Sequence, residues 1–247
     1  GSNLTNEDYV AFREFSKTIS QSEKSFYLND DLFYKGFFGD NIELAKIDDL
    51  NSSDAIVIWA EDLKEKLPVL YLRIRQAVKN GVKLVVFGHT NETLSDIADV
   101  FYGKDIVSEN FEILKDISKM KEINNLVVGK NITAILGKST PYQSDESVTK
   151  LFEFLNSNAN LKVLNAYSKG NTYGAFQTLE NLKGLNDFVN DITEDNTDLL
   201  FIVGADPIGR SVYSNQIKSI IKSIDTVVTL DNFNHETSEL SDYVVPI

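Results

Sequence analysis

Two segments that follow strand-like apolar runs carry residues able to bind a ligand. Gly204-Ala205-Asp206-Pro207 comes directly after the run 199–203, and Asp231 to Thr237 follows the run 226–230. In open α/β sheets ligands bind outside the carboxyl ends of the strands, and a glycine there lets a ligand approach the backbone. The candidate cofactor-binding residues are therefore Gly204, Asp206, Asp231 and His235.

Each segment also has a purely structural interpretation. Asp206 and Pro207 suit an ordinary turn between a strand and a helix, in which Asp caps the helix and Pro begins it. The second segment suits a polar loop with Glu236 at a helix start. The only other histidine, His89, follows Gly88 and has no defined partner. Because a metal site needs several ligands, we predict no metal site. We also predict no catalytic residue in this chain.

The segment Trp59-Ala60-Glu61-Asp62 follows another apolar run. A phosphate-binding turn presents glycine and the positive end of a helix, whereas Glu61 and Asp62 would repel a pyrophosphate. Gly137-Lys138-Ser139-Thr140 resembles the end of a phosphate loop, but Ile132 stands where the upstream glycine is needed. We predict no phosphate-binding loop.

The elements that must position these residues alternate between strands and helices. The predicted strands are 54–60, 83–88, 131–136, 161–164, 199–204, 226–230 and 243–245. The predicted helices are 6–20 with Asn6 as cap, 68–79 with Val69, Leu72, Ile74 and Val78 facing inward, 91–101, 110–121, 145–157 and 212–223. The stretch 168–187 is predicted as an irregular loop. This alternation, with continuously apolar strands, predicts a doubly wound α/β fold with mostly parallel sheets and helices on both faces.

We expect three parts along the chain. A helix and an aromatic segment at 1–40 lead in from a preceding domain, a first α/β block spans 41–125 and a second spans 126–247. The aromatic cluster either packs the edge of a sheet or faces another domain; it comprises Phe26, Tyr27, Phe33, Tyr34, Phe37 and Phe38.

Composition excludes several classes of protein. The chain of 247 residues has no cysteine, which excludes disulfides, thiolate zinc sites and iron–sulfur ligands within it. The net charge of −13 disfavours nucleic-acid binding, and no apolar run is long enough to enter a membrane. The Gly-Ser start and the apolar end at Ile247 lead us to expect an excised fragment of a longer protein.

Several segments together resemble the molybdopterin oxidoreductase family. The strand 55–58, a Pro68-Val69-Leu70 helix start and the strand after Gly81 occur in the family's order. Residues 171–175 are similar to its Asn-x-x-Gly-Ala segment, and residues 200–207 to its strand ending in Gly-Ala-Asp-Pro. Residues 226–246 are similar to its signature of a strand, an Asp, a Glu-Thr pair and an Asp-containing strand ending in Pro. The matching residues are Asp231, Glu236, Thr237, Asp242 and Pro246.

Within that family the chain is most similar to the G subunit of NADH-quinone oxidoreductase, respiratory complex I. The resemblance implies an internal, structural segment without a cofactor, in a subunit whose iron–sulfur clusters lie elsewhere and carry electrons from NADH to quinone. It implies other subunits of a membrane-associated complex as partners, and a cytoplasmic position against the inner side of the cell membrane. It also places the family's Gly-x-Asn nucleotide turn at Ala60-Glu61-Asp62, where the glycine is missing.

Two other interpretations remain. In the first, the chain belongs to a catalytic molybdopterin-dependent enzyme such as a formate dehydrogenase. Molybdopterin guanine dinucleotide would then contact Gly204, Asp206, Asp231 and His235. In the second, the chain is an unrelated α/β binding domain, an interpretation that rests on the fold pattern alone.

Overall fold

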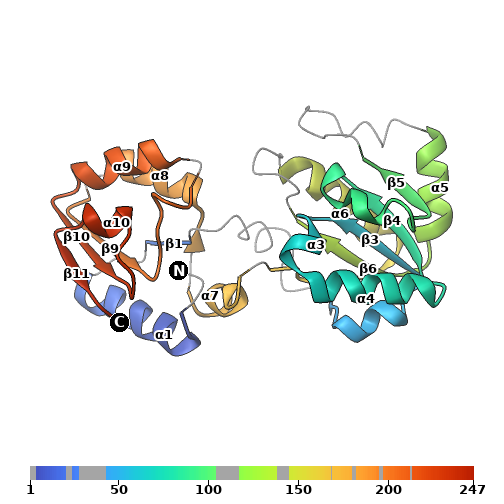
Figure 1. Ribbon diagram of the computed structural model, residues 1–247, viewed down its shortest axis with the longest axis horizontal. Coiled ribbons are helices and arrows are strands. Elements are labelled where there is room, and N and C mark those ends of the chain that lie inside the picture. Colours follow the sequence, from blue (N-terminus) through green and yellow to red (C-terminus); the bar gives the residue numbers. More distant parts are fainter. Residues whose placement is uncertain are drawn as a thin grey trace. The chain divides into compact units, whose positions relative to one another are not determined.

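The chain folds into two compact units (Figure 1). The computed structural model describes residues 4–20, 24–27, 43–103, 117–137, 145–167, 169–179, 182–194, 197–211 and 213–247. Unit 1 combines Gly1–Leu32 with Lys169–Ile247, and unit 2 is Phe33–Ser168. In the sequence, unit 2 is therefore an insertion into unit 1.

Unit 2 is built on a six-stranded parallel sheet of order β2-β7-β6-β3-β4-β5. Its strands are β2 (Glu43–Leu44), β3 (Ala55–Trp59), β4 (Lys83–Phe87), β5 (Val100–Tyr102), β6 (Asn131–Leu136) and β7 (Asn160–Val163). Its helices are η3 (Ile47–Asn51), α3 (Leu63–Lys66), α4 (Pro68–Lys79), η4 (His89–Leu94), α5 (Ile117–Val127) and α6 (Asp145–Asn158).

The strand order places a switch point between β3 and β6. From β3 the chain adds β4 and β5 on one side, and then returns to add β6 and β7 on the other. Because crossovers between parallel strands are right-handed, opposite directions of travel put α4 on one face and α6 on the other. The predicted doubly wound α/β fold is therefore confirmed in this unit.

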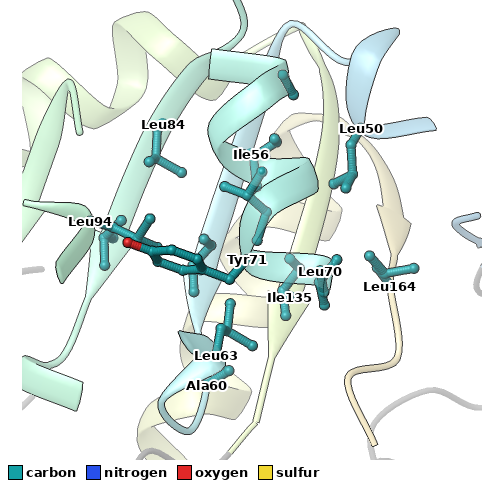
Figure 2. Close-up of a cluster of buried hydrophobic side chains, with 14 of the residues drawn as sticks. Leu50, Ile56, Ala60, Leu63, Leu70, Tyr71, Leu84, Leu94, Ile135 and Leu164 are labelled. Atoms are coloured by element: carbon teal, nitrogen blue, oxygen red, sulfur yellow. The ribbon is translucent and has the colours of Figure 1, made fainter. Parts of the chain in front are cut away.

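One hydrophobic core of unit 2 lies under α4 (Figure 2). Leu70, Tyr71 and Ile74 from this helix pack on alternate residues of the sheet, among them Ile56 and Leu84. The prediction that Val69 and Leu72 face inward is wrong, because both side chains are exposed. Positions 70, 71, 74, 77 and 78 form the apolar stripe with helical spacing, whereas 69 and 72 share the opposite stripe with Arg73 and Gln76.

Unit 1 contains a three-stranded parallel sheet of order β11-β10-β9 and a two-stranded parallel pair of β1 and β8. Its strands are β1 (Ser25–Phe26), β8 (Leu182–Lys183), β9 (Leu199–Val203), β10 (Thr226–Leu230) and β11 (Tyr243–Val245). Its helices are α1 (Asn6–Phe15), η1 (Ser16–Ser20), α7 (Thr172–Thr178), α8 (Leu185–Glu194), α9 (Ser214–Ser223) and α10 (Glu236–Glu239). Isoleucines of α9 pack on Ile202 and Val227 to form the core of this sheet.

The N-terminal helix has the predicted bounds but a different cap. Thr5, not Asn6, is its cap: the Thr5 hydroxyl accepts a hydrogen bond from the Asp8 N–H, and the Asp8 side chain accepts one from the Thr5 N–H. The α-helix ends at Phe15 and continues as the π-helical segment η1 to Ser20, so the predicted range 6–20 is helical throughout. Tyr9 is its buried residue and joins the core of Leu4, Tyr27 and Leu182.

The unit division also differs from the predicted blocks 1–40, 41–125 and 126–247. β6 pairs with β3 and β7 pairs with β6 in one sheet, so the segment from 126 to about 168 belongs with the first block. The physical reason is that β6 fills the vacant side of β3, a long-range pairing that periodicity does not reveal. Phe26 and Tyr27 pack within unit 1, and the other members of the aromatic cluster lie outside the described residues.

Two local predictions are wrong. The predicted helix 91–101 is the 3-10 helix η4 followed by the strand β5, which extends the sheet beyond β4. The predicted loop 168–187 contains α7, β8 and the start of α8, because long-range packing orders these polar segments.

The predicted helix 110–121 is observed as α5 from Ile117, and residues 104–116 lie outside the described part. No helix among the described residues is long and apolar enough to cross a membrane.

Candidate functional site

Three of the four predicted site residues meet at the carboxyl ends of β9 and β10. Asp206 follows β9, Asp231 follows β10, and His235 is the N-cap of α10. The Nε2 atom of His235 lies 3.3 Å from Asp231 Oδ2, and its Nδ1 atom lies 3.4 Å from Asp206 Oδ1. The side chains are only 12–18% exposed. The histidine ring therefore lies between two carboxylates.

The Asp206 carboxylate is held by donors from its own unit. The Thr237 hydroxyl donates to Asp206 Oδ1 over 2.6 Å, and the Gly209 N–H donates to the same atom over 3.0 Å. Burial favours the neutral acid, but these hydrogen bonds and the nearby His235 ring outweigh it, so the pKa of Asp206 lies below its usual value. A Cβ at Gly209 would overlap the Asp206 carboxylate, so this turn needs glycine.

The His235 ring also caps α10. The backbone N–H of Ser238 donates to His235 Nδ1 over 3.3 Å, and the backbone N–H of His235 donates to Ser238 Oγ over 2.8 Å. When the ring is neutral, this acceptor role places its proton on Nε2, which then donates to Asp231. When the ring is protonated, its positive charge favours the carboxylate form of Asp206. The other Asp231 oxygen accepts from the Phe233 N–H over 3.0 Å.

This cluster does not suit a metal ion. Asp206 faces Nδ1 of the ring and Asp231 faces Nε2. A metal ion bound to one ring nitrogen would therefore be near only one of the two carboxylates. Among the described residues no group of three His, Asp or Glu side chains could hold a metal. The cluster can instead tie together the two loops that follow β9 and β10 and the start of α10, since each of these carries one of its members.

Gly204 is not part of the polar cluster. Its φ of +56° lies in the region that favours glycine, and its N–H donates to the Leu230 carbonyl over 2.8 Å. A Cβ built on Gly204 would lie 3.1 Å from Leu4 Cδ2. The side chain of Leu4 thus fills the space through which a ligand would approach this backbone.

The Asn171–Ala175 segment binds the N-terminal segment of the same chain. The Asn171 amide donates to the Leu4 carbonyl over 2.8 Å and to Asn6 Oδ1 over 3.0 Å. A Cβ at Gly174 would overlap the Oδ1 atoms of Asn6 and Asn171. Asn171 and Gly174 therefore hold α1 against α7.

The switch point of unit 2 offers a second candidate position, at the turn between β3 and α3. The Asp62 side chain accepts hydrogen bonds from the N–H groups of Lys64 over 2.9 Å and Glu65 over 3.3 Å. The N–H of Leu63 donates to Asn91 Oδ1 over 3.1 Å. The N–H groups of the first three residues of α3 thus already have acceptors within the chain.

Asn91, which lies in η4 after β4, stabilises the turn between β3 and α3. It is 1% exposed, and its amide donates to the carbonyls of Ala60 over 3.0 Å and Glu61 over 3.3 Å. A single buried side chain thus satisfies one N–H group and two carbonyls of the turn.

The comparison with known families agrees with this architecture. The family model for molybdopterin oxidoreductase matches residues 1–247. The chain belongs to the molybdopterin oxidoreductase family. The match covers residues of both units, so unit 1 and unit 2 both belong to this molybdopterin oxidoreductase domain.

The residues at the β3–β6 switch point do not fit the pyrophosphate of a molybdopterin dinucleotide. Anions bind at a helix start through free N–H groups and the positive end of the helix. Here Asp62 and Asn91 occupy those N–H groups, and the charges of Glu61 and Asp62 oppose a phosphate. The sequence analysis identified Glu61 and Asp62 as unfavourable for a phosphate. It did not identify Asn91, because this residue lies 28 positions from Leu63 and no local sequence pattern relates the two.

Two residues of the unit 1 cluster were also missed as site residues. Thr237 was noted within the family's Glu-Thr pair, but its bond to Asp206 spans 31 residues. Gly209 had only its spacing, three residues after Asp206, as a signal. His89 follows β4 as expected, but its side chain lies outside the described part, as do residues 138–140 of the predicted phosphate-loop remnant.

Proposed function

We propose that this chain is a structural segment of the G subunit of NADH-quinone oxidoreductase and binds no molybdopterin cofactor. It supports electron transfer from NADH to quinone through iron–sulfur clusters located elsewhere in the parent subunit. Its partners are other subunits of a membrane-associated respiratory complex on the cytoplasmic side. The observation that carries the proposal is the α3 turn, whose N–H groups are taken by Asp62 and Asn91.

The geometry of unit 1 supports the same proposal. Leu4 covers the backbone of Gly204. Asp206 Oδ1 accepts hydrogen bonds from Gly209 and Thr237, and the two oxygens of Asp231 lie against the Phe233 N–H and the His235 ring. A ligand that needed these oxygens would first have to displace those hydrogen bonds, which costs more than exchanging a bond to water.

The test is the cofactor content of the intact parent protein. Purified from its natural host, it should contain iron and labile sulfide but no molybdenum, tungsten or pterin in stoichiometric amount. It should co-purify with NADH-quinone oxidoreductase activity. A stoichiometric pterin with molybdenum or tungsten would overturn the proposal.

One observation favours a catalytic molybdopterin-dependent oxidoreductase, such as a formate dehydrogenase, as the second candidate. Asp206, Asp231 and His235 come together at the carboxyl ends of two strands, where this fold class binds ligands. In that case Asp206→Asn and His235→Gln variants of the full protein would lower the occupancy of molybdopterin guanine dinucleotide. Unchanged occupancy would reject this candidate.

A further inference from the structure

The outward side of α4 combines exposed aliphatic and cationic side chains. Val69 and Leu72 are 66% and 63% exposed. They share one stripe of the helix with Arg73, Gln76 and Lys79, all of them exposed. We call these five residues the α4 face. Scattered apolar residues are normal on a surface, but an apolar patch with a polar rim is typical of a binding surface.

The charge of the α4 face is opposite to that of the chain. The whole sequence has 37 acidic and 24 basic residues, yet α4 contains no Asp or Glu. Arg75 has a partner on its own unit, since it lies 3.7 Å from Asp96 and its side chain stacks on Tyr71. Within the described part of the chain no carboxylate lies within 4.0 Å of Arg73 or Lys79.

We propose that the α4 face docks an acidic surface of another polypeptide, with carboxylates placed around an apolar contact. Arg73 and Lys79 would pair with those carboxylates while Val69 and Leu72 are buried between them. Charge complementarity of this kind fixes the orientation of a partner and speeds its association.

The observations favour this partner over two others. In a symmetric contact with a second copy, Arg73 and Lys79 would face the same cations, which repel. A membrane surface is disfavoured because Leu70, Tyr71 and Ile74 fix the inner side of α4 to the sheet, which leaves only Val69 and Leu72 to enter lipid. The proposal does not depend on the proposed function, since a cofactor-loaded enzyme would present the same helix face.

The first test is photo-crosslinking in the full-length parent protein in its natural host. A p-benzoylphenylalanine replaces Leu72, or Val128 as a matched control, which is an exposed aliphatic residue of unit 2 outside α4. We expect the probe at 72, and not at 128, to label one identified peptide of another polypeptide that contains Asp or Glu beside apolar residues. Labelling of the same chain, of a second copy or of lipid alone, or no labelling at all, would overturn the proposal.

The second test uses charge reversal on both sides of the contact. Arg73→Glu with Lys79→Glu should weaken binding of the identified partner by about tenfold or more, and a partner carboxylate changed to Lys should restore it. The control pair Lys121→Glu with Lys130→Glu makes the same change of charge on exposed residues of unit 2 outside α4 and should leave binding unchanged. Circular dichroism confirms that all variants are folded. The proposal would be contradicted if the affinity for the partner were unchanged in the Arg73→Glu and Lys79→Glu variant, or if it fell equally in the control variant. Cofactor content measured on the same preparations tests the proposed function separately.

Discussion

The Asp206 carboxylate connects parts of unit 1 that are far apart in the sequence. It accepts hydrogen bonds from Thr237 and Gly209 and lies beside His235, so the loop after β9 is fixed to α10. Hydrogen bonds to an ionised acceptor are shorter and stronger than neutral ones. We therefore expect the stability of unit 1 to depend on this single carboxylate.

Removing the Thr237 hydroxyl tests that dependence. Thr237→Val keeps the shape of the buried side chain but leaves Asp206 without this donor and the Ile208 N–H without its acceptor. We expect the free energy of unfolding of unit 1 to fall by about 2 kcal/mol, measured by urea denaturation at pH 7. Thr237→Ser retains the hydroxyl and should lose clearly less. Equal losses in the two variants would mean that the hydrogen bond contributes little.

The lowered pKa of Asp206 predicts a pH dependence of stability. A carboxyl whose pKa is lower in the folded state stabilises the fold above its unfolded pKa of about 4. This contribution is lost as the pH falls through the lower folded value. Unfolding followed between pH 5 and pH 2 should therefore show a steeper loss of stability for the natural chain than for Asp206→Asn. Parallel curves would show that other carboxyls account for the acid sensitivity.

At the scale of elements, the α3 turn depends on Asn91. Asn91→Ala would leave the Leu63 N–H and the carbonyls of Ala60 and Glu61 without this partner in a buried place. Each such buried group costs about 1–3 kcal/mol, so we expect the free energy of unfolding of unit 2 to fall by about 3 kcal/mol in chemical denaturation. Asn80→Ala changes an exposed asparagine of the same unit and should cost less than about 0.5 kcal/mol. A loss for Asn91→Ala as small as that would contradict the assigned role.

The contact between α1 and α7 makes a second prediction for this scale. Gly174→Ala places a methyl group against Asn6 and Asn171, so α1 must shift away from α7. We expect a loss of about 1–3 kcal/mol, the usual cost of overpacking, and faster hydrogen exchange in the α1 helix. Gly170→Ala is the matched control because no atom lies within 4 Å of its added methyl group. Similar exchange in both variants would contradict the close contact.

At the scale of the molecule, the insertion of unit 2 into unit 1 predicts separate responses to core mutations. Ile74→Ala empties a fully buried site in the core under α4 and should cost about 2–5 kcal/mol. Hydrogen exchange should then accelerate in β3, β4 and β6 while β9 and β10 keep their protection, since each unit has its own core. Equal acceleration in both sheets would show that the units unfold together.

The charge of the molecule is also uneven between the units. Unit 1 has 18 acidic and 8 basic residues, whereas unit 2 has 19 acidic and 16 basic residues. Unit 1 therefore carries most of the negative charge, and the cationic α4 face lies on the nearly balanced unit. Long-range repulsion by the chain would oppose an acidic partner least at unit 2.

The sequence by itself determined the strands at 55–59, 83–87, 131–136, 199–203 and 226–230, the helix 68–79 and the family. Continuous apolar runs and helix-ending signals are local properties, so they can be detected without knowledge of the fold. Only the tertiary structure decided that β6 completes the sheet beside β3, that Asn91 closes the α3 turn and that Thr237 holds Asp206. Each of these features joins residues that lie tens of positions apart in the sequence. Several apolar strands could pair with β3, and many polar side chains could form the hydrogen bonds, so no local pattern identifies the actual partner.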